Sequence, residues 1–463
     1  MRTLAPLLVA LLSPWLLNGA SAQPSTATVN VDNAIQAGGA ANAAINKQDF
    51  TVGNAANGGN ATVKAGTVVQ IGGAAQTGLN KQKLSVGNAD SGKAQVNADA
   101  VVQFGGAAQG AVNMQTLDVG NAANGGKATV KAGTVAQIGG AAQTGLNKQK
   151  LSVGNADNGK AQVNAENVVQ FGGAAQGAVN MQTLDVGNAT NGGKATVKAG
   201  TAIQIGGAAQ GALSNQKMTV GNADSGRAQV NADNVVQIGG AAQGAINTQT
   251  LEVGNAIGSG SQTNVRAGNV VQTGGAGYGA ANSQSLTVGN ATGAAKTNVS
   301  VDNAIQIGGA GAGAVNVQKL AVGNATGSGS SSNVKAGTVT QIGGAGAGAI
   351  NRQTLEIGNA SGGGKSNANV GSALQIGGAG VGAVNDQTIK VGNADSGGKS
   401  NASVAGIVQV GGAGALAGNK QTVEIGNAAN GQTSSIKTGT IVQVGGGAMG
   451  VSNNQSVKIG NAQ

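Results

Sequence analysis

One unit of about 34 residues recurs along almost the whole chain, and this repeat constrains the fold more than any other feature of the sequence. Each unit contains a glutamine followed two residues later by a glycine, and successive marker glutamines are 33, 34 or 35 residues apart. A unit this short cannot bury an apolar face alone, so the units must stack on one another. The thirteen marker glutamines are Gln36, Gln70, Gln103, Gln137, Gln170, Gln204, Gln237, Gln272, Gln306, Gln341, Gln375, Gln409 and Gln443. We therefore expect one continuous array of thirteen units over residues 23–463.

Three further positions keep a fixed distance from the marker glutamine. For the marker Gln70 they are an asparagine at Asn80, a second glutamine at Gln82 and a Gly-Asn pair that ends at Asn88. The same offsets hold in every unit, except that Ser214 replaces the first asparagine in one of them. Length varies only between each Gly-Asn-Ala and the next marker glutamine, so that stretch is predicted to contain a loop. Besides the marker glutamines, the residues predicted to stack in register are Gln48, Gln82, Gln115, Gln149, Asn54, Asn88, Asn121 and Asn155.

The local pattern within a unit is typical of β-strands. Gln82, Leu84 and Val86 alternate with residues of exposed type, which is the period of a half-buried strand. Around Gln70 both faces are apolar, so that strand is either covered on two sides or offers one face to another molecule. A third short strand is expected at 61–65. Helix is disfavoured, because the recurrent glycines each cost about 0.5–1 kcal/mol in a helix relative to alanine.

These observations predict an all-β fold, a β-solenoid in which each unit contributes one coil. Strands about 4.8 Å apart would give thirteen coils a length on the order of 60 Å. Stacking in register places Gln on Gln and Asn on Asn, and such ladders satisfy amide groups whose unpaired burial costs roughly 1–3 kcal/mol each. The glycines after the marker Gln and before the Asn are expected to form tight bends where a β-carbon would clash. Handedness and the inward face of the marker strand stay open.

Residues 1–22 have the pattern of a secretory signal peptide. Arg2 supplies the positive start, residues 4–17 form an apolar run, and small residues at 20–22 form a cleavage site. A membrane span is the competing interpretation, but Pro14 interrupts a run shorter than the roughly 20 apolar residues that a bilayer requires. We expect residues 1–22 to be removed on export, which predicts a secreted, extracellular or cell-surface protein.

The charge of the remaining chain is a mild positive bias. Without Arg2 there are 25 basic and 16 acidic residues, so the net charge is 25 − 16 = +9. Such a bias attracts anionic polysaccharides, nucleic acids or cell surfaces, but the basic residues form no dense run and aromatic residues for base stacking are nearly absent. The sequence therefore predicts a solubilising surface, with anionic matrix polymers as a candidate partner class and no specific nucleic acid.

The sequence gives no sign of catalysis, and we expect no enzyme, cofactor or metal site. The chain has no Cys and no His, which removes disulfides and the commonest general base and metal ligand. Its Asp-Ser-Gly and Asp-Asn-Gly segments are predicted to be plain turns and not calcium loops. Five acidic residues between apolar positions are predicted to lie on a solvated outer face: Asp118, Asp185, Glu252, Glu356 and Glu424.

The core pattern Gln-x-Gly-Gly…Asn-x-Gln, found at Gln70, Gly72, Gly73, Asn80 and Gln82, resembles the repeats of curlin-type bacterial functional amyloids. It is similar, more loosely, to the Gln/Asn/Gly/Ala-rich repeats of the Fap fibre subunits. The resemblance covers essentially all of residues 23–463. It implies a secreted subunit that polymerises with itself into cross-β fibres, with a nucleator subunit and an outer-membrane secretion channel as further partners.

Two functions follow from the sequence. A structural fibre subunit of biofilm matrix or a surface coat is favoured, because neither end of the array looks like a polar capping repeat and both open edges could template another copy. The alternative is a monomeric or cell-attached β-solenoid binding module, such as an adhesin. An ice-binding plane is disfavoured because the position three before the marker Gln is mixed, as in Thr67, Ala100 and Asn167. A β-helical polysaccharide-degrading enzyme lacks an acidic and basic cluster at any one level.

Overall fold

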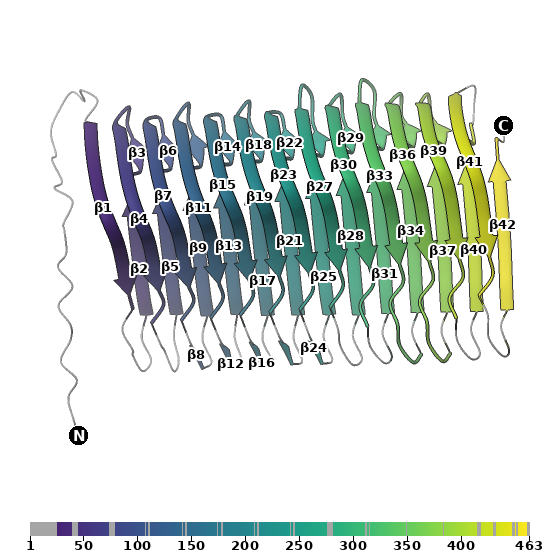
Figure 1. Ribbon diagram of the computed structural model, residues 1–463, viewed down its shortest axis with the longest axis horizontal. Helices are drawn as coiled ribbons and strands as arrows, with labels where there is room; N and C mark the ends of the chain where they lie inside the picture. Colours follow the sequence, from purple (N-terminus) through teal and green to yellow (C-terminus); the bar gives the residue numbers. More distant parts are fainter. Residues whose placement is uncertain are drawn as a thin grey trace.

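The structure is a computed structural model. It describes residues 26–38, 45–73, 79–106, 108–109, 112–140, 142–143, 146–173, 175–176, 179–207, 209–210, 213–240, 242–243, 246–275, 281–310, 313, 315–348, 350–382, 384–413, 418–428, 432–446, 450 and 452–460. These residues form a parallel β-solenoid of about eleven complete turns, which confirms the predicted all-β class and the stacking of the repeat (Figure 1). The predicted signal peptide lies outside the described residues. Within them, no helix is long and apolar enough to cross a membrane.

Each repeat makes one coil, and each coil contributes one strand to each of two large sheets (Figure 1). The sheet that contains the marker glutamines, here the marker sheet, is 13-stranded, and its strands are all equal in length. Its strands are β1 (Thr26–Ala37), β4 (Asn60–Ile71), β7 (Lys93–Phe104), β11 (Lys127–Ile138), β15 (Lys160–Phe171), β19 (Lys194–Ile205), β23 (Arg227–Ile238), β27 (Gln262–Thr273), β30 (Lys296–Ile307), β33 (Ser331–Ile342), β36 (Lys365–Ile376), β39 (Lys399–Val410) and β41 (Thr433–Val444).

The chain returns through a second 13-stranded sheet of shorter strands, which faces the marker sheet across the core. Its strands are β2 (Ile45–Val52), β5 (Leu79–Val86), β9 (Val112–Val119), β13 (Leu146–Val153), β17 (Val179–Val186), β21 (Leu213–Val220), β25 (Ile246–Val253), β28 (Ala281–Val288), β31 (Val315–Val322), β34 (Ile350–Ile357), β37 (Val384–Val391), β40 (Gly418–Ile425) and β42 (Ser452–Ile459).

Two ribbons of two-residue strands lie at the two margins of the solenoid (Figure 1). The turn ribbon, which precedes the marker sheet in each coil, contains β3 (Ala55–Ala56), β6 (Ala89–Asp90), β10 (Ala122–Ala123), β14 (Ala156–Asp157), β18 (Ala189–Thr190), β22 (Ala223–Asp224), β26 (Ala256–Ile257), β29 (Ala291–Thr292), β32 (Ala325–Thr326), β35 (Ala360–Ser361) and β38 (Ala394–Asp395). The ribbon at the opposite margin contains β8 (Ala108–Gln109), β12 (Ala142–Gln143), β16 (Ala175–Gln176), β20 (Ala209–Gln210) and β24 (Ala242–Gln243).

All strand pairs in the large sheets are parallel and in register. Gln36 pairs with Gln70 between β1 and β4, and Gln70 pairs with Gln103 between β4 and β7. In the second sheet Gln82 pairs with Gln115 between β5 and β9. Equivalent positions of successive repeats therefore lie directly over one another, as the constant spacings predicted.

The marker strand is longer than the sequence predicted. The prediction of a separate short strand at 61–65 is wrong, because those residues and Gln70 belong to one continuous strand, β4. The inward face of β4 shifts by one residue at Gly66, where an added β-carbon would lie 2.2 Å from the carbonyl oxygen of Asp32 in the preceding coil. After this shift Val68 and Gln70 point inward, while the intervening apolar positions face outward and are half-buried or exposed. Gly66 therefore lies at a kink inside one strand and does not end it.

The core is a column of small and branched side chains between the two large sheets. In each coil one Leu-type and one Val-type residue from the second sheet, such as Leu84 and Val86, pack against Val63 and Val68 of the marker strand. All four are fully or almost fully buried. A separate alanine cluster fills the space beneath the turn ribbon in the N-terminal half. This cluster consists of alanine side chains alone.

Two kinds of glycine form the bends, as the sequence predicted. Gly87 has a φ of +64°, and its β-carbon would lie 2.7 Å from Val96 Cγ2. At Gly72 the obstacle is the next coil, since a β-carbon would lie 2.2 Å from the backbone nitrogen of Gly106. The first glycine is required by backbone conformation and the second by the close approach of successive coils.

Candidate functional site

The most regular chemical feature of the structure is a column of marker glutamines that runs through the core. Gln70 is fully buried, and its Nε2 donates a hydrogen bond to Gln36 Oε1 at 2.8 Å. Gln103 donates to Gln70 at 2.7 Å, and Gln137 donates to Gln103 at 2.8 Å. The same link recurs up to Gln443, which donates to Gln409 at 2.8 Å.

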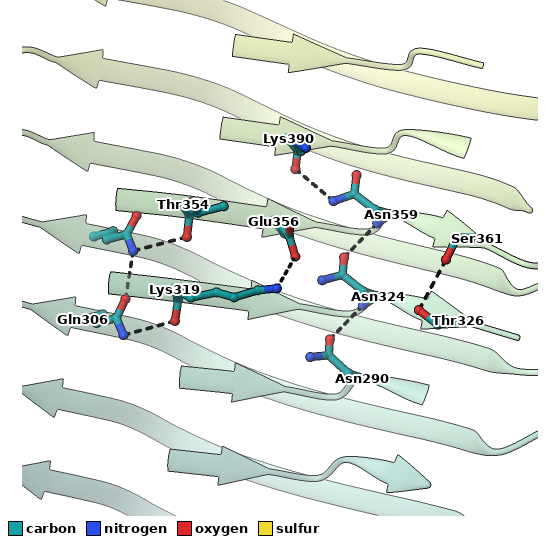
Figure 2. Close-up of polar contacts among 11 residues, drawn as sticks. Asn290, Gln306, Lys319, Asn324, Thr326, Thr354, Glu356, Asn359, Ser361 and Lys390 are labelled. Carbon is teal, nitrogen blue, oxygen red and sulfur yellow. Dashed lines mark hydrogen bonds and ion pairs between the residues drawn. The ribbon is translucent and has the colours of Figure 1, made fainter. Parts of the chain in front are cut away.

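Each marker glutamine also joins the two large sheets. The Nε2 of Gln70 donates a second hydrogen bond to the backbone carbonyl of Lys83 in the second sheet, at 3.2 Å. Figure 2 shows the same contact for Gln306, which donates to the carbonyl of Lys319 at 3.1 Å. Both amide hydrogens and the amide oxygen of such a glutamine are therefore paired without water.

The second glutamine of each repeat forms a parallel column in the second sheet. Gln115 donates to Gln82 at 3.2 Å, and Gln149 donates to Gln115 at 3.0 Å. Gln82 lies above Gln48 in the same register. Gln149 also donates to the carbonyl of Phe171 at 3.1 Å, so this column links the second sheet back to the marker sheet of the next coil. The two glutamine columns thus cross-link the sheets in both directions.

The predicted asparagine positions stack, but they do not form an amide-to-amide ladder. Here the backbone N–H of Asn88 donates to Asn54 Oδ1 at 2.9 Å, and the backbone N–H of Asn121 donates to Asn88 Oδ1 at 2.8 Å. Asn155 continues the series with a bond to Asn121 Oδ1 at 2.9 Å. These residues follow a glycine at the end of a strand, where the backbone N–H needs a partner outside the sheet ladder. Figure 2 shows the same series farther along the chain, between Asn290, Asn324 and Asn359.

A third buried amide column was missing from the predicted ladder residues. Asn113 Nδ2 donates to Asn147 Oδ1 at 3.0 Å, and Asn147 Nδ2 donates to Asn180 Oδ1 at 3.1 Å. These asparagines lie two positions before the second glutamine of each repeat, so the signal was present in the spacing. Their amides donate toward the C-terminal end, whereas both glutamine columns donate toward the N-terminal end. The core therefore contains amide columns of opposite polarity.

Ser214 interrupts the buried asparagine column. Its hydroxyl is too short to reach both neighbours, and Asn180 Nδ2, Ser214 Oγ and Asn247 Oδ1 are buried without a hydrogen-bond partner among the described residues. Each such atom costs roughly 1–3 kcal/mol. The only repeat that departs from the asparagine rule is thus a local weak point.

Four of the five acidic residues predicted on a solvated outer face line shallow grooves beside the turn ribbon. Asp118 and Asp185 are half-buried there, beside the asparagines of the Gly-Asn pairs. Glu356, also half-buried, forms a 3.3 Å ion pair with Lys319 (Figure 2). These acidic residues lie between buried neighbours and therefore point outward, as predicted, but they are only partly exposed. Glu252 and Glu424 are half-buried in the same way.

Burial raises the pKa of the Asp118 carboxyl above its ordinary value of 3.8, although nearby Lys150 and Lys83 and the Ser152 hydroxyl act in the opposite direction. The described part of the chain contains no group of three or more His, Cys, Asp or Glu that could hold a metal ion.

No protein-family model matches the chain, and no curated protein or solved structure matches it either. The resemblance to curlin-type and Fap repeats therefore stays a prediction.

We predict that Ser214→Asn stabilises the protein by about 2 kcal/mol, because the longer amide restores both missing hydrogen bonds. Urea unfolding followed by circular dichroism measures the change. Asn147→Ser is the matched control, because it creates a second gap and should lower the free energy of unfolding by a similar amount. An Asn at 214 that leaves stability unchanged would show that the buried asparagine column is not stabilising.

We predict that Asp118→Asn raises the melting temperature at pH 7. The raised pKa of Asp118 means that the folded state holds its charged form less well than the unfolded chain does, so ionisation costs stability above the raised pKa. The cost is relieved as the pH falls through that pKa, and below the ordinary value of 3.8 the variant and the wild type should melt together. Melting curves between pH 3 and pH 7 check this; a difference independent of pH contradicts it.

Proposed function

We propose that this chain is an exported structural protein, a fibre subunit of an extracellular matrix or surface coat that assembles end to end. In this proposal residues 1–22 are a signal peptide and the mature array has thirteen units, a count supported by the 13 strands in each large sheet. A secretion channel and a nucleator subunit belong to the proposal through the resemblance alone. The observation that supports end-to-end assembly most directly is that the described solenoid has an open sheet edge at each end.

Both ends of the described solenoid are open sheet edges. β1 and β2 form one end, β41 and β42 form the other, and the described residues place no strand beyond them. Apolar side chains that are buried in inner coils are uncovered there: Val457 and Ile459, the equivalents of the buried Leu84 and Val86, are 45% and 56% exposed. An exposed strand edge with uncovered apolar residues is a template for pairing with another chain.

The polarity of the glutamine columns makes the two ends complementary. Every described glutamine-to-glutamine hydrogen bond donates toward the N-terminal end. The last glutamines, Gln443 and Gln455, therefore have amide oxygens with no donor among the described residues. At the other end Gln36 accepts a bond from Gln70, and its own Nε2 is the next donor in the series. A second copy stacked head to tail would continue both the sheets and the columns. Such a heterologous contact does not close and generates a filament.

We predict that the purified protein forms thioflavin-positive fibres whose diffraction has a reflection at about 4.7–4.8 Å along the fibre axis. The double variant Gln443→Lys, Gln455→Lys places two cations on the C-terminal end and should slow fibre growth by about tenfold or more, since docking would bury two unpaired charges and remove both amide acceptors.

The matched control is Gln95→Lys, Gln162→Lys, which makes the same chemical change at exposed outward positions of inner coils. This control should assemble at the wild-type rate. Equal effects of the two double variants would contradict end-to-end growth. A wild-type protein that stays monomeric at high concentration would favour the alternative, a solenoid binding module.

A further inference from the structure

The excess positive charge of the protein is confined to one surface, the outer face of the marker sheet. Outward positions of this sheet carry fourteen Lys or Arg against five Asp or Glu, a net of +9. The eleven other cations beyond Arg2 are matched by eleven carboxylates elsewhere on the solenoid. The fourteen cations are Lys64, Lys93, Lys127, Lys131, Lys160, Lys194, Lys198, Arg227, Arg266, Lys296, Lys335, Lys365, Lys399 and Lys437. The sequence suggested a diffuse bias, but the fold collects it on one face.

Five of these cations form an uninterrupted row, here the basic column. Strand register places Lys93, Lys127, Lys160, Lys194 and Arg227 directly beside one another on five successive strands. Neighbouring strands lie about 4.8 Å apart. Like charges directly opposite each other destabilise a sheet. The basic column therefore opposes folding, whereas the glutamine columns stabilise the solenoid.

The carboxylates on the same face do not neutralise the basic column. They occupy the kink position, as Glu166 does, six residues along the strand from Lys160, which is about 20 Å. That exceeds the Debye length of roughly 8 Å at physiological ionic strength. Glu166 instead lies near Lys131 and Lys198, which are two residues from the kink on the strands to either side.

The turn carboxylates next to the basic column also have other partners. Asp90 accepts a hydrogen bond from Asn124 Nδ2 at 2.6 Å, and Asp157 accepts one from Asn191 Nδ2 at 2.7 Å. Both line the groove beside the second sheet, not the outer face of the marker sheet. Across the described residues, the ion pairs all belong to the second sheet. Among the described residues, no cation of the basic column forms an ion pair, so all five remain available to a partner.

We propose that the basic column binds a linear acidic polysaccharide, a polymer with a carboxylate on each sugar, lying along the solenoid axis. A rigid row of cations with a constant spacing fits a partner whose charges also repeat along a line. Beside the row, two residues along each strand, runs a column of exposed amide and hydroxyl groups, Gln95, Thr129 and Gln162 among them. These groups can exchange hydrogen bonds with sugar hydroxyls, which point charges alone cannot do. The row exists on a single solenoid, so this binding does not depend on fibre assembly.

A nucleic acid fits this surface less well. Binding of single strands relies on aromatic side chains on which bases stack. The exposed aromatic residues of the marker sheet, Phe104 and Phe171, lie at the opposite ends of their strands from the basic column. The surface thus combines cations with sugar-binding polar groups and has no stacking platform beside them.

The test compares two five-residue variants of the full-length protein for binding to polygalacturonate, with neutral dextran and mixed-sequence single-stranded DNA as comparison polymers. The first variant replaces Lys93, Lys127, Lys160, Lys194 and Arg227 by Gln, the residue that Gln262 already supplies at this register. The second variant makes the same charge change on the outer face of the second sheet, with Gln replacing Lys81, Lys83, Lys148, Lys150 and Lys217.

We expect the wild type to bind polygalacturonate and not dextran. The first variant should bind it at least about tenfold more weakly, and the second should stay within about twofold of the wild type, because counterion release is local to the contacted charges. The first variant should melt no lower than the wild type, since it relieves repulsion. Equal losses in both variants, tighter binding to DNA than to polygalacturonate, or no binding by the wild type would each overturn the proposal.

Discussion

The buried amide column is the interaction on which the rest of this structure depends. A glutamine in an apolar core is costly unless all its hydrogen-bonding groups are paired. Gln137 meets this requirement only when Gln103 lies directly below it, Gln170 directly above it and the Lys150 carbonyl opposite it. A shift of the register by one residue would leave these groups unpaired and turn the glutamine outward. The columns therefore fix the register of a chain whose alanine, valine and glycine side chains discriminate poorly between registers.

A fixed register turns every repeated residue into a row. Apolar positions become a continuous core, and glycines become rows of tight bends. Surface charges follow the same rule, which is why residues a whole repeat apart in sequence, such as Lys127 and Lys160, become nearest neighbours. The surface of this protein therefore repeats the side chains of one coil along the solenoid axis. A small excess of positive charge in each repeat thus becomes a strongly charged face.

Much of this architecture could be predicted from spacing alone, because constant offsets between polar residues identify rows. Spacing does not reveal how a row is bonded. Asn88 and Asn113 both belong to series with a constant spacing, yet the first pairs with a backbone N–H at a strand end and the second forms an amide ladder inside the core. The strand at 61–65 was predicted too short because the shift of the inward face at Gly66 interrupts the alternation of apolar residues. The basic face was missed because its members are neighbours in space but distant along the chain.

The most direct test of the amide columns is hydrogen exchange of the glutamine side-chain amides, followed by NMR in deuterated water. Outward-facing Gln95 and Gln162 provide an internal reference in the same molecule. The account predicts that the side-chain amides of Gln103 and Gln137 exchange only when the solenoid unfolds, at least about a thousandfold more slowly than the outward ones. Exchange of buried and outward glutamine amides at the same rate would contradict it.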